Sequence, residues 1–123
     1  MAPPRTTAVR GALARGVFAV VVLISLAVLF APASDVPSAP AGVDKVVHLA
    51  LFAALAASGR WAGVAARPLA VLLLGYAAVS EVVQGLPALG RSMSPADWVA
   101  DAVGVLVGLV LWQLASRRSS APS

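Results

Sequence analysis

Residues 16–31 read GVFAVVVLISLAVLFA, a run with one serine and no charged residue. Three arginines, Arg5, Arg10 and Arg15, precede this run. An uncharged run flanked by basic residues is typical of a helix that crosses a lipid bilayer. A basic lead, an apolar core and the small residues APA at 31–33 are also typical of a cleavable signal peptide. Because further apolar runs follow, we expect a retained first membrane helix at about residues 16–32.

The composition of the whole chain supports a membrane location. The 123 residues are 60% hydrophobic and only 11% charged, whereas soluble domains carry about 25% charged residues. A chain this small would need far more polar surface to fold in water. The net charge is +4, but the basic residues flank the apolar runs, so we expect no nucleic-acid partner. The chain contains no cysteine, which excludes disulfides and thiolate sites.

The second apolar run is short for a membrane span. It has only 14 uncharged residues, 46–59, between Lys45 and Arg60, whereas a span needs about 20. The run reaches an adequate length if it starts at Asp44, or if the Arg60 side chain extends towards the interface and the helix continues to Ala66. We expect a second span over residues 44–66.

Proline and tryptophan mark the limits of the third and fourth runs. The third run follows Pro68 and reaches Pro87, which suit a helix start and a helix end. The fourth follows Ser94-Pro95 and has a tryptophan near each end, where indole rings favour the membrane interface. These runs predict an all-α, polytopic membrane protein, a four-transmembrane-helix bundle with short loops.

The expected organisation is one membrane domain between two polar tails. The domain covers residues 16–116, with helices at about 16–32, 44–66, 69–88 and 96–115. Residues 1–15 form a basic cytoplasmic tail, and residues 117–123 form a disordered cytoplasmic tail. Seven arginines flank the helix ends on the side of the termini, and only Lys45 and Arg91 lie on the other side. Because basic residues accumulate in cytoplasmic loops, we expect both termini in the cytoplasm.

The remaining ionisable side chains fall towards the outer side. At 1.5 Å per residue, Glu81 lies about 9 Å below Pro87, and Asp101 lies about 6 Å below Asp97. An acidic group at such depth costs on the order of 2–3 kcal/mol, so it should face other helices, a partner or trapped water. The polar residues expected at this side are Asp44, Lys45, His48, Glu81, Gln84, Arg91, Ser94, Asp97 and Asp101.

Helical spacing places several of these residues on shared faces, because residues three or four apart are neighbours on a helix. The pairs are Asp44–His48, Glu81–Gln84 and Asp97–Asp101. The face of Asp101 continues through Gly104 and Gly108, a small-xxx-small step that lets a neighbouring backbone approach closely. We expect these two glycines to serve helix packing.

A purely structural interpretation of each polar residue stays open. Asp44 and Asp97 could simply stabilise helix N-termini, and His48 could only bond a carboxylate. Glu81 could lock the bundle by pairing with Arg91 or His48. Glu81 is nevertheless the strongest functional candidate, because an intramembrane acid is a functional-site hypothesis by default.

Three separated blocks of the sequence resemble the VanZ-like family. They are DKVVH at 44–48, SEVVQ at 80–84 and GRSMSPADWVADAVG at 90–104. Their order is similar to that family's Asp-Lys-x-x-His, Ser-Glu-x-x-Gln, and Gly-Arg followed by Ser-x-x-Asp and Asn-x-x-Gly. The likeness covers about residues 44–108 and departs at Asp101, where the family more often has asparagine. The resemblance implies a small multi-pass protein of the bacterial plasma (inner) membrane, associated with the cell envelope and with resistance to glycopeptides such as teicoplanin.

The leading functional hypothesis is a non-enzymatic membrane protein with a polar, acidic pocket at the outer leaflet. Such a pocket would bind a lipid, a lipid-linked cell-wall precursor or an assembly partner. An acidic cluster suits a cationic or hydroxyl-rich group, or one coordinated through a divalent ion. Lys45 and Arg91 could instead hold a phosphate. Antibiotic susceptibility is a possible consequence of such binding.

The main alternative is an intramembrane hydrolase or headgroup transferase that uses His48 with Glu81 or Asp97. No nucleophile elbow, HExxH or Walker sequence is present, and one histidine among scattered carboxylates is a weak metal signal. The sequence therefore predicts no catalytic residue, no metal and no other cofactor. A proton or ion conduit and a purely structural subunit also stay open. The sequence does not indicate the ligand or the oligomeric state.

Overall fold

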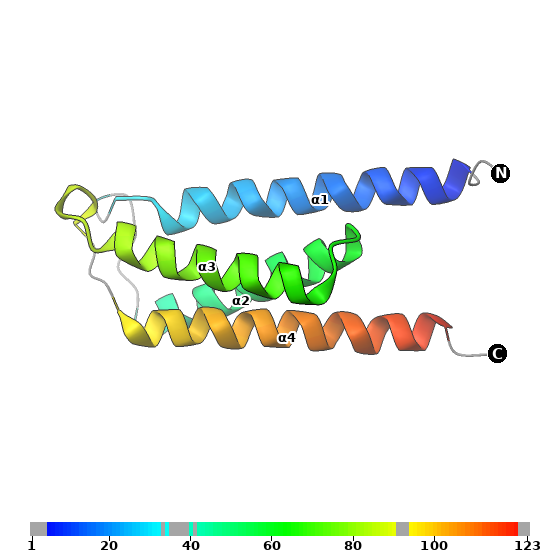
Figure 1. Ribbon diagram of the computed structural model, residues 1–123. Coiled ribbons are helices and arrows are strands. Elements are labelled where there is room, and N and C mark those ends of the chain that lie inside the picture. Colours follow the sequence, from blue (N-terminus) through cyan, green and yellow to red (C-terminus); the bar gives the residue numbers. More distant parts are fainter. Residues whose placement is uncertain (1–4, 33, 35–39, 41, 91–93, 121–123) are drawn as a thin grey trace.

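The computed structural model, which describes residues 5–32, 34, 40, 42–90 and 94–120, is all-helical. Its elements in chain order are α1 (Arg5–Leu29), α2 (Val43–Trp61), α3 (Ala66–Gln84), the short 3-10 helix η2 (Pro87–Leu89) and α4 (Pro95–Ser120). Figure 1 shows the N-terminal end of α1 and the C-terminal end of α4 at the same end of the bundle. The opposite end, where α1 and α3 finish and α2 and α4 begin, is called the cluster end below.

Three of the four α-helices are long and apolar enough to cross a membrane. The candidate spans are Ala8–Leu29, Ala66–Gln84 and Pro95–Arg118. The prediction of an all-helical chain is therefore confirmed for the described residues, and α1, α3 and α4 have the length and apolar composition that a membrane span requires. α2 differs, because Asp44, Lys45 and Arg60 place three charges within its 19 residues. Its role as a fourth span stays a prediction.

Two helices extend beyond the apolar runs that predict them. α1 begins at Arg5 rather than near Gly16, because residues 5–15 are rich in alanine, arginine and leucine, which are good helix formers. α4 continues to Ser120 instead of ending at Ala115. Residues 5–15 and 117–120, predicted as tails, are thus helical. Hydropathy finds the apolar part of a helix and not its ends.

The middle helices differ from prediction at their shared turn. α2 ends at Trp61 rather than at residue 66, and Gly63 follows with a φ of +99° that reverses the chain. α3 begins at Ala66, before Pro68 rather than after it. Proline is tolerated in the first turn, where its missing N–H has no helical acceptor. α3 ends at Gln84, short of the predicted residue 88.

α2 is the centre of the bundle, since it packs against each of the other three helices and most extensively against α4. Phe52 is fully buried, and its ring lies 5.7 Å from that of Tyr76 on α3. The apolar core around it consists of Leu29, Leu51, Phe52, Leu55, Ala56, Leu69, Leu73, Ala77 and Val105. All four helices therefore contribute to one core.

Two glycines let the backbones of α2 and α4 approach closely. A Cβ atom added at Gly104 would collide with the carbonyl oxygen of Leu49, and one at Gly108 would collide with that of Ala53. Glycine is the residue that permits such contact between membrane helices. The close approach fixes the position of α4 on α2, and with it the position of the polar residues one turn nearer the cluster end.

Candidate binding site

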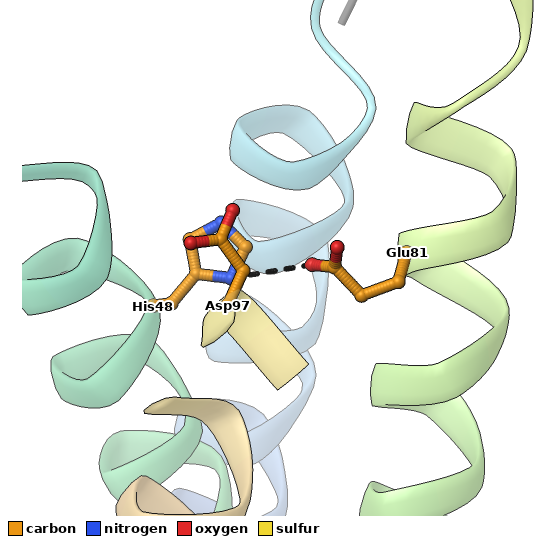
Figure 2. A group of neighbouring side chains, drawn as sticks. All are labelled: His48, Glu81 and Asp97. Carbon is orange, nitrogen blue, oxygen red and sulfur yellow. Dashed lines mark ion pairs between the residues drawn. The ribbon is translucent and has the colours of Figure 1, made fainter. Parts of the chain in front are cut away.

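Four titratable side chains from three helices meet at the cluster end. His48 comes from the second turn of α2, Glu81 from the last turn of α3, and Asp97 and Asp101 from the first two turns of α4. They are 2%, 4%, 8% and 0% exposed, respectively. Figure 2 shows His48, Glu81 and Asp97 pointing into the space between the helices. The two deep acids, Glu81 and Asp101, thus face other helices.

The shortest polar contact joins α2 to α4. Nδ1 of His48 lies 2.7 Å from Oδ1 of Asp101. A carboxylate only accepts hydrogen bonds, so Nδ1–H of His48 donates and the ring is held in one orientation. The second oxygen of Asp101, Oδ2, is buried and has no hydrogen-bond partner among the described residues. The pair therefore leaves part of the Asp101 charge unsatisfied.

Glu81 is held by only one of its two carboxylate oxygens. The backbone N–H of Ser94 donates to Oε2 at 2.9 Å. Oε1 is buried and has no hydrogen-bond partner in the part of the chain that the structure describes. It lies 4.0 Å from Nδ1 of His48, the pair that Figure 2 marks with a dashed line. At that distance the two groups attract each other but do not form a hydrogen bond.

Asp97 pairs with Lys45 at the start of α4. Nζ of Lys45 donates to Oδ1 of Asp97 at 3.1 Å and lies 3.6 Å from Oδ2 of Asp44. The N–H of Asp97 donates to Oγ of Ser94 at 3.3 Å. Ser94 directly precedes Pro95, the first residue of α4, and therefore occupies the position of an N-cap. Asp44 is exposed, and its pairing with Lys45 lies at the surface.

The structure does not gather every residue that the sequence places at this end. Nε2 of Gln84 donates to the carbonyl oxygen of Leu29 at 2.8 Å, so Gln84 ties α3 to α1. Arg91 lies outside the described residues. Gly104 and Gly108 lie in the contact between α2 and α4. The residues that do meet form what is called the polar cluster below: Lys45, His48, Glu81, Ser94, Asp97 and Asp101.

The polar cluster carries more negative than positive charge. Among the described residues, three carboxylates, Glu81, Asp97 and Asp101, face one ammonium group, that of Lys45, which is partly exposed. Buried carboxylates are costly unless they are paired and hydrogen-bonded. The two unpartnered oxygens are therefore the part of the cluster most able to accept a cation or a hydrogen-bond donor.

The sequence analysis groups His48 with Glu81 and Asp97 but predicts no metal, whereas the structure brings potential ligand atoms of all three together. His48, Glu81 and Asp97 each offer a ligand atom, and these three atoms all lie within 4.8 Å of one another. The residues are separated by 33 and 16 positions in the chain, so no local motif indicates that they meet. Only the relative rotation of three helices brings them together. No protein-family model, curated protein or solved structure matches this chain.

Proposed function

We propose that this chain is a VanZ-like multi-pass protein of the bacterial plasma membrane that binds an envelope lipid or a lipid-linked cell-wall precursor at the cluster end. The blocks that resemble the family, 44–48, 80–84 and 90–104, supply every residue of the polar cluster. A family likeness carried by residues that meet in space supports a shared function better than a likeness spread over a hydrophobic helix. Altered susceptibility to glycopeptides such as teicoplanin would follow from binding a cell-wall precursor.

The proposed topology has four spans, with both termini in the cytoplasm. Its support is the excess of arginine on the side of the termini. The 19 residues of α2 extend roughly 28 Å at 1.5 Å per residue, close to the thickness of the hydrocarbon core. Lys45 and Arg60 lie near its two ends, from which long basic side chains reach the interface. The cluster end then faces the outer leaflet.

The observation that carries the binding proposal is the pair of unpartnered carboxylate oxygens, Oε1 of Glu81 and Oδ2 of Asp101. Both belong to side chains buried between helices, where an uncompensated charge is costly. A ligand that supplies a cation or hydroxyl donors would lower that cost. Headgroups of envelope lipids and sugar-bearing precursors offer such groups within the outer leaflet.

Lipid co-purification tests the proposal. We expect Glu81→Gln and Asp101→Asn proteins to lose a lipid or precursor that the wild-type protein retains in mild detergent, as measured by mass spectrometry of extracts. Asp44→Asn is the matched control, because it removes a carboxylate that is exposed and outside the polar cluster. Expression in a host sensitive to teicoplanin gives a second readout. Equal lipid content and equal susceptibility in all four proteins would contradict the proposal.

One observation favours a second candidate, an intramembrane hydrolase or headgroup transferase. The His48 ring is oriented by Asp101, and the free oxygen of Glu81 lies 4.0 Å away, an arrangement that can serve general acid–base catalysis. Release of a soluble headgroup from a lipid-linked diphosphate measures this activity. Enzymatic turnover that is abolished in His48→Gln would favour this candidate, whereas retention of the intact lipid favours binding alone.

A further inference from the structure

The three ligand atoms of His48, Glu81 and Asp97 lie close enough together to share one ion. They fall within 4.8 Å of one another. Ligands bound tetrahedrally at 2.0–2.2 Å lie roughly 3.3 Å apart. The ligand atoms thus need to close by up to about 1.5 Å, which small rotations about the side-chain torsions of the three residues can supply. We infer that these residues form a binding site for a divalent transition-metal ion, with Zn²⁺ the best fit.

Glu81 gives independent support for this inference. Only 5% of its side-chain surface is exposed. Its Oε1 atom has no hydrogen-bond partner and points at the His48 ring (Figure 2). The backbone N–H of Ser94 already donates to the other oxygen, Oε2. Oε1 is therefore the oxygen that remains for an ion. A buried carboxylate oxygen in this position is a suitable ligand for a cation.

The donor set selects the class of metal. One imidazole and two carboxylates match the nitrogen and oxygen ligands of Zn²⁺, whereas Mg²⁺ and Ca²⁺ prefer oxygen ligands alone. Asp101 lies outside the three-residue group but holds the His48 ring at 2.7 Å. A metal-binding histidine usually donates its other ring N–H to a carboxylate, so with Nδ1–H on Asp101 the ion would be held by Nε2 of His48. Asp101 is therefore assigned as a positioning residue for His48.

Charge balance also favours a divalent ion. The three carboxylates of the polar cluster exceed its single ammonium group by two negative charges, with His48 neutral. A divalent cation would neutralise that excess. The ammonium group of Lys45 competes with the metal ion for the carboxylate of Asp97, because its Nζ lies 3.1 Å from that carboxylate. Removing the Lys45 charge should therefore strengthen metal binding while it weakens the ion pair.

The inference deepens the proposed function and rests on the polar cluster being a binding site. A bound metal ion would allow an acidic cluster to accept a phosphate-bearing headgroup, which the carboxylates alone would repel. The predicted ligand class is accordingly a phosphate or diphosphate lipid bound through the ion. Metal binding itself requires no lipid and is measured separately.

The test titrates Zn²⁺ alone into the full-length protein in detergent, purified without a histidine tag and stripped with a chelator. The chain has one histidine and no cysteine, so few other groups compete for the ion. We expect one Zn²⁺ per chain by elemental analysis and calorimetry. We expect Glu81→Gln to bind at least tenfold more weakly, Asp101→Asn 10- to 100-fold more weakly, and Asp44→Asn to bind as the wild type does.

Two further measurements keep the inference testable where a variant fails to fold. Glu81→Gln preserves shape, and circular dichroism checks its helical content. Lys45→Gln should bind Zn²⁺ more tightly, a gain that a purely structural ion pair would not produce. Absence of Zn²⁺ binding by the folded wild-type protein, equal binding by Glu81→Gln, or equally tight binding of Mg²⁺ would overturn the inference. Lipid retention that persists without Zn²⁺ binding would leave the proposed function standing, and Zn²⁺ binding without lipid retention would remove only that function.

Discussion

α1 and α4 are similar in length and apolar character, yet they attach to the bundle in different ways. α4 lies against α2 through Gly104 and Gly108, where no side chain separates the two backbones, and it buries two acids. α1 exposes most of its large apolar side chains and is held near its C-terminal end by hydrogen bonds from α3. Hydropathy thus assigns both helices to the membrane, whereas small and polar residues decide how firmly each one is bound.

A bulky side chain in the glycine contact between α2 and α4 should reduce stability more than any change to the attachment of α1. Gly108→Leu places a side chain against the carbonyl oxygen of Ala53, so α4 must move away from α2. We expect a loss of about 3 kcal/mol in the free energy of unfolding, the upper range for overpacked sites. Gly75→Leu on α3 is the control, because a Cβ there meets nothing within 4 Å. Equal stability of both variants in detergent unfolding would contradict the close packing of α4.

Removal of the buried histidine should have the next largest effect. His48→Ala leaves the fully buried carboxylate of Asp101 without its partner. Leaving a buried charged group without its hydrogen-bond partner costs about 3 kcal/mol. The double variant His48→Ala/Asp101→Ala should lose less stability than the sum of the two single variants. Additive losses would show that the two side chains do not interact.

Variants that weaken the attachment of α1 should lose less stability, and the structural change should be confined to α1. Gln84→Leu removes the hydrogen bond to the carbonyl oxygen of Leu29, and Tyr76→Phe removes the one between Tyr76 and Ser25, which spans 2.8 Å. Polar contacts between membrane helices average about 0.6 kcal/mol, so each variant should lose about that much. Because the chain has no cysteine, spin labels can be placed on α1 and α3. The distance distribution between them should broaden, while that between α2 and α4 stays unchanged.

Truncation of a lipid-facing side chain should change least. Leu23 on α1 is 64% exposed, so Leu23→Ala should alter the free energy of unfolding by less than about 0.5 kcal/mol. The matched substitution Leu69→Ala removes a core side chain that is 1% exposed and should cost about 2–5 kcal/mol. Similar costs at the two positions would mean that α1 is covered by a partner along this face.

The helices could be predicted because long uncharged runs occur where a segment is not exposed to water. The limits of α1 and α4 were not, since their ends depend on helix propensity in polar residues such as 5–15 and 117–120. α2 shows a different limit. Its three charges lie near its ends, and charge counting alone does not distinguish a span whose basic side chains reach the interface from a helix that stays within the bundle.

The polar cluster was predictable in its location but not in its contacts. Alternating helix directions place the starts of α2 and α4 beside the end of α3, so polar residues near those limits fall at one end. Spacing does not indicate that Lys45 bonds Asp97 as well as approaching its neighbour Asp44, because that depends on helix rotation. Gln84 shares a face with Glu81 by spacing, yet it bonds the carbonyl oxygen of Leu29 in the last turn of α1.

The dependence of the polar cluster on α4 has a consequence for biogenesis. α4 follows α2 and α3 in the chain, and it carries Asp101 and follows directly on Ser94, the groups that bond His48 and Glu81. Until it inserts, the hairpin of α2 and α3 holds a histidine and a glutamate that lack these partners. Arrival of α4 therefore supplies the partners of both groups, and a nascent chain interrupted before Pro95 would leave His48 and Glu81 without them.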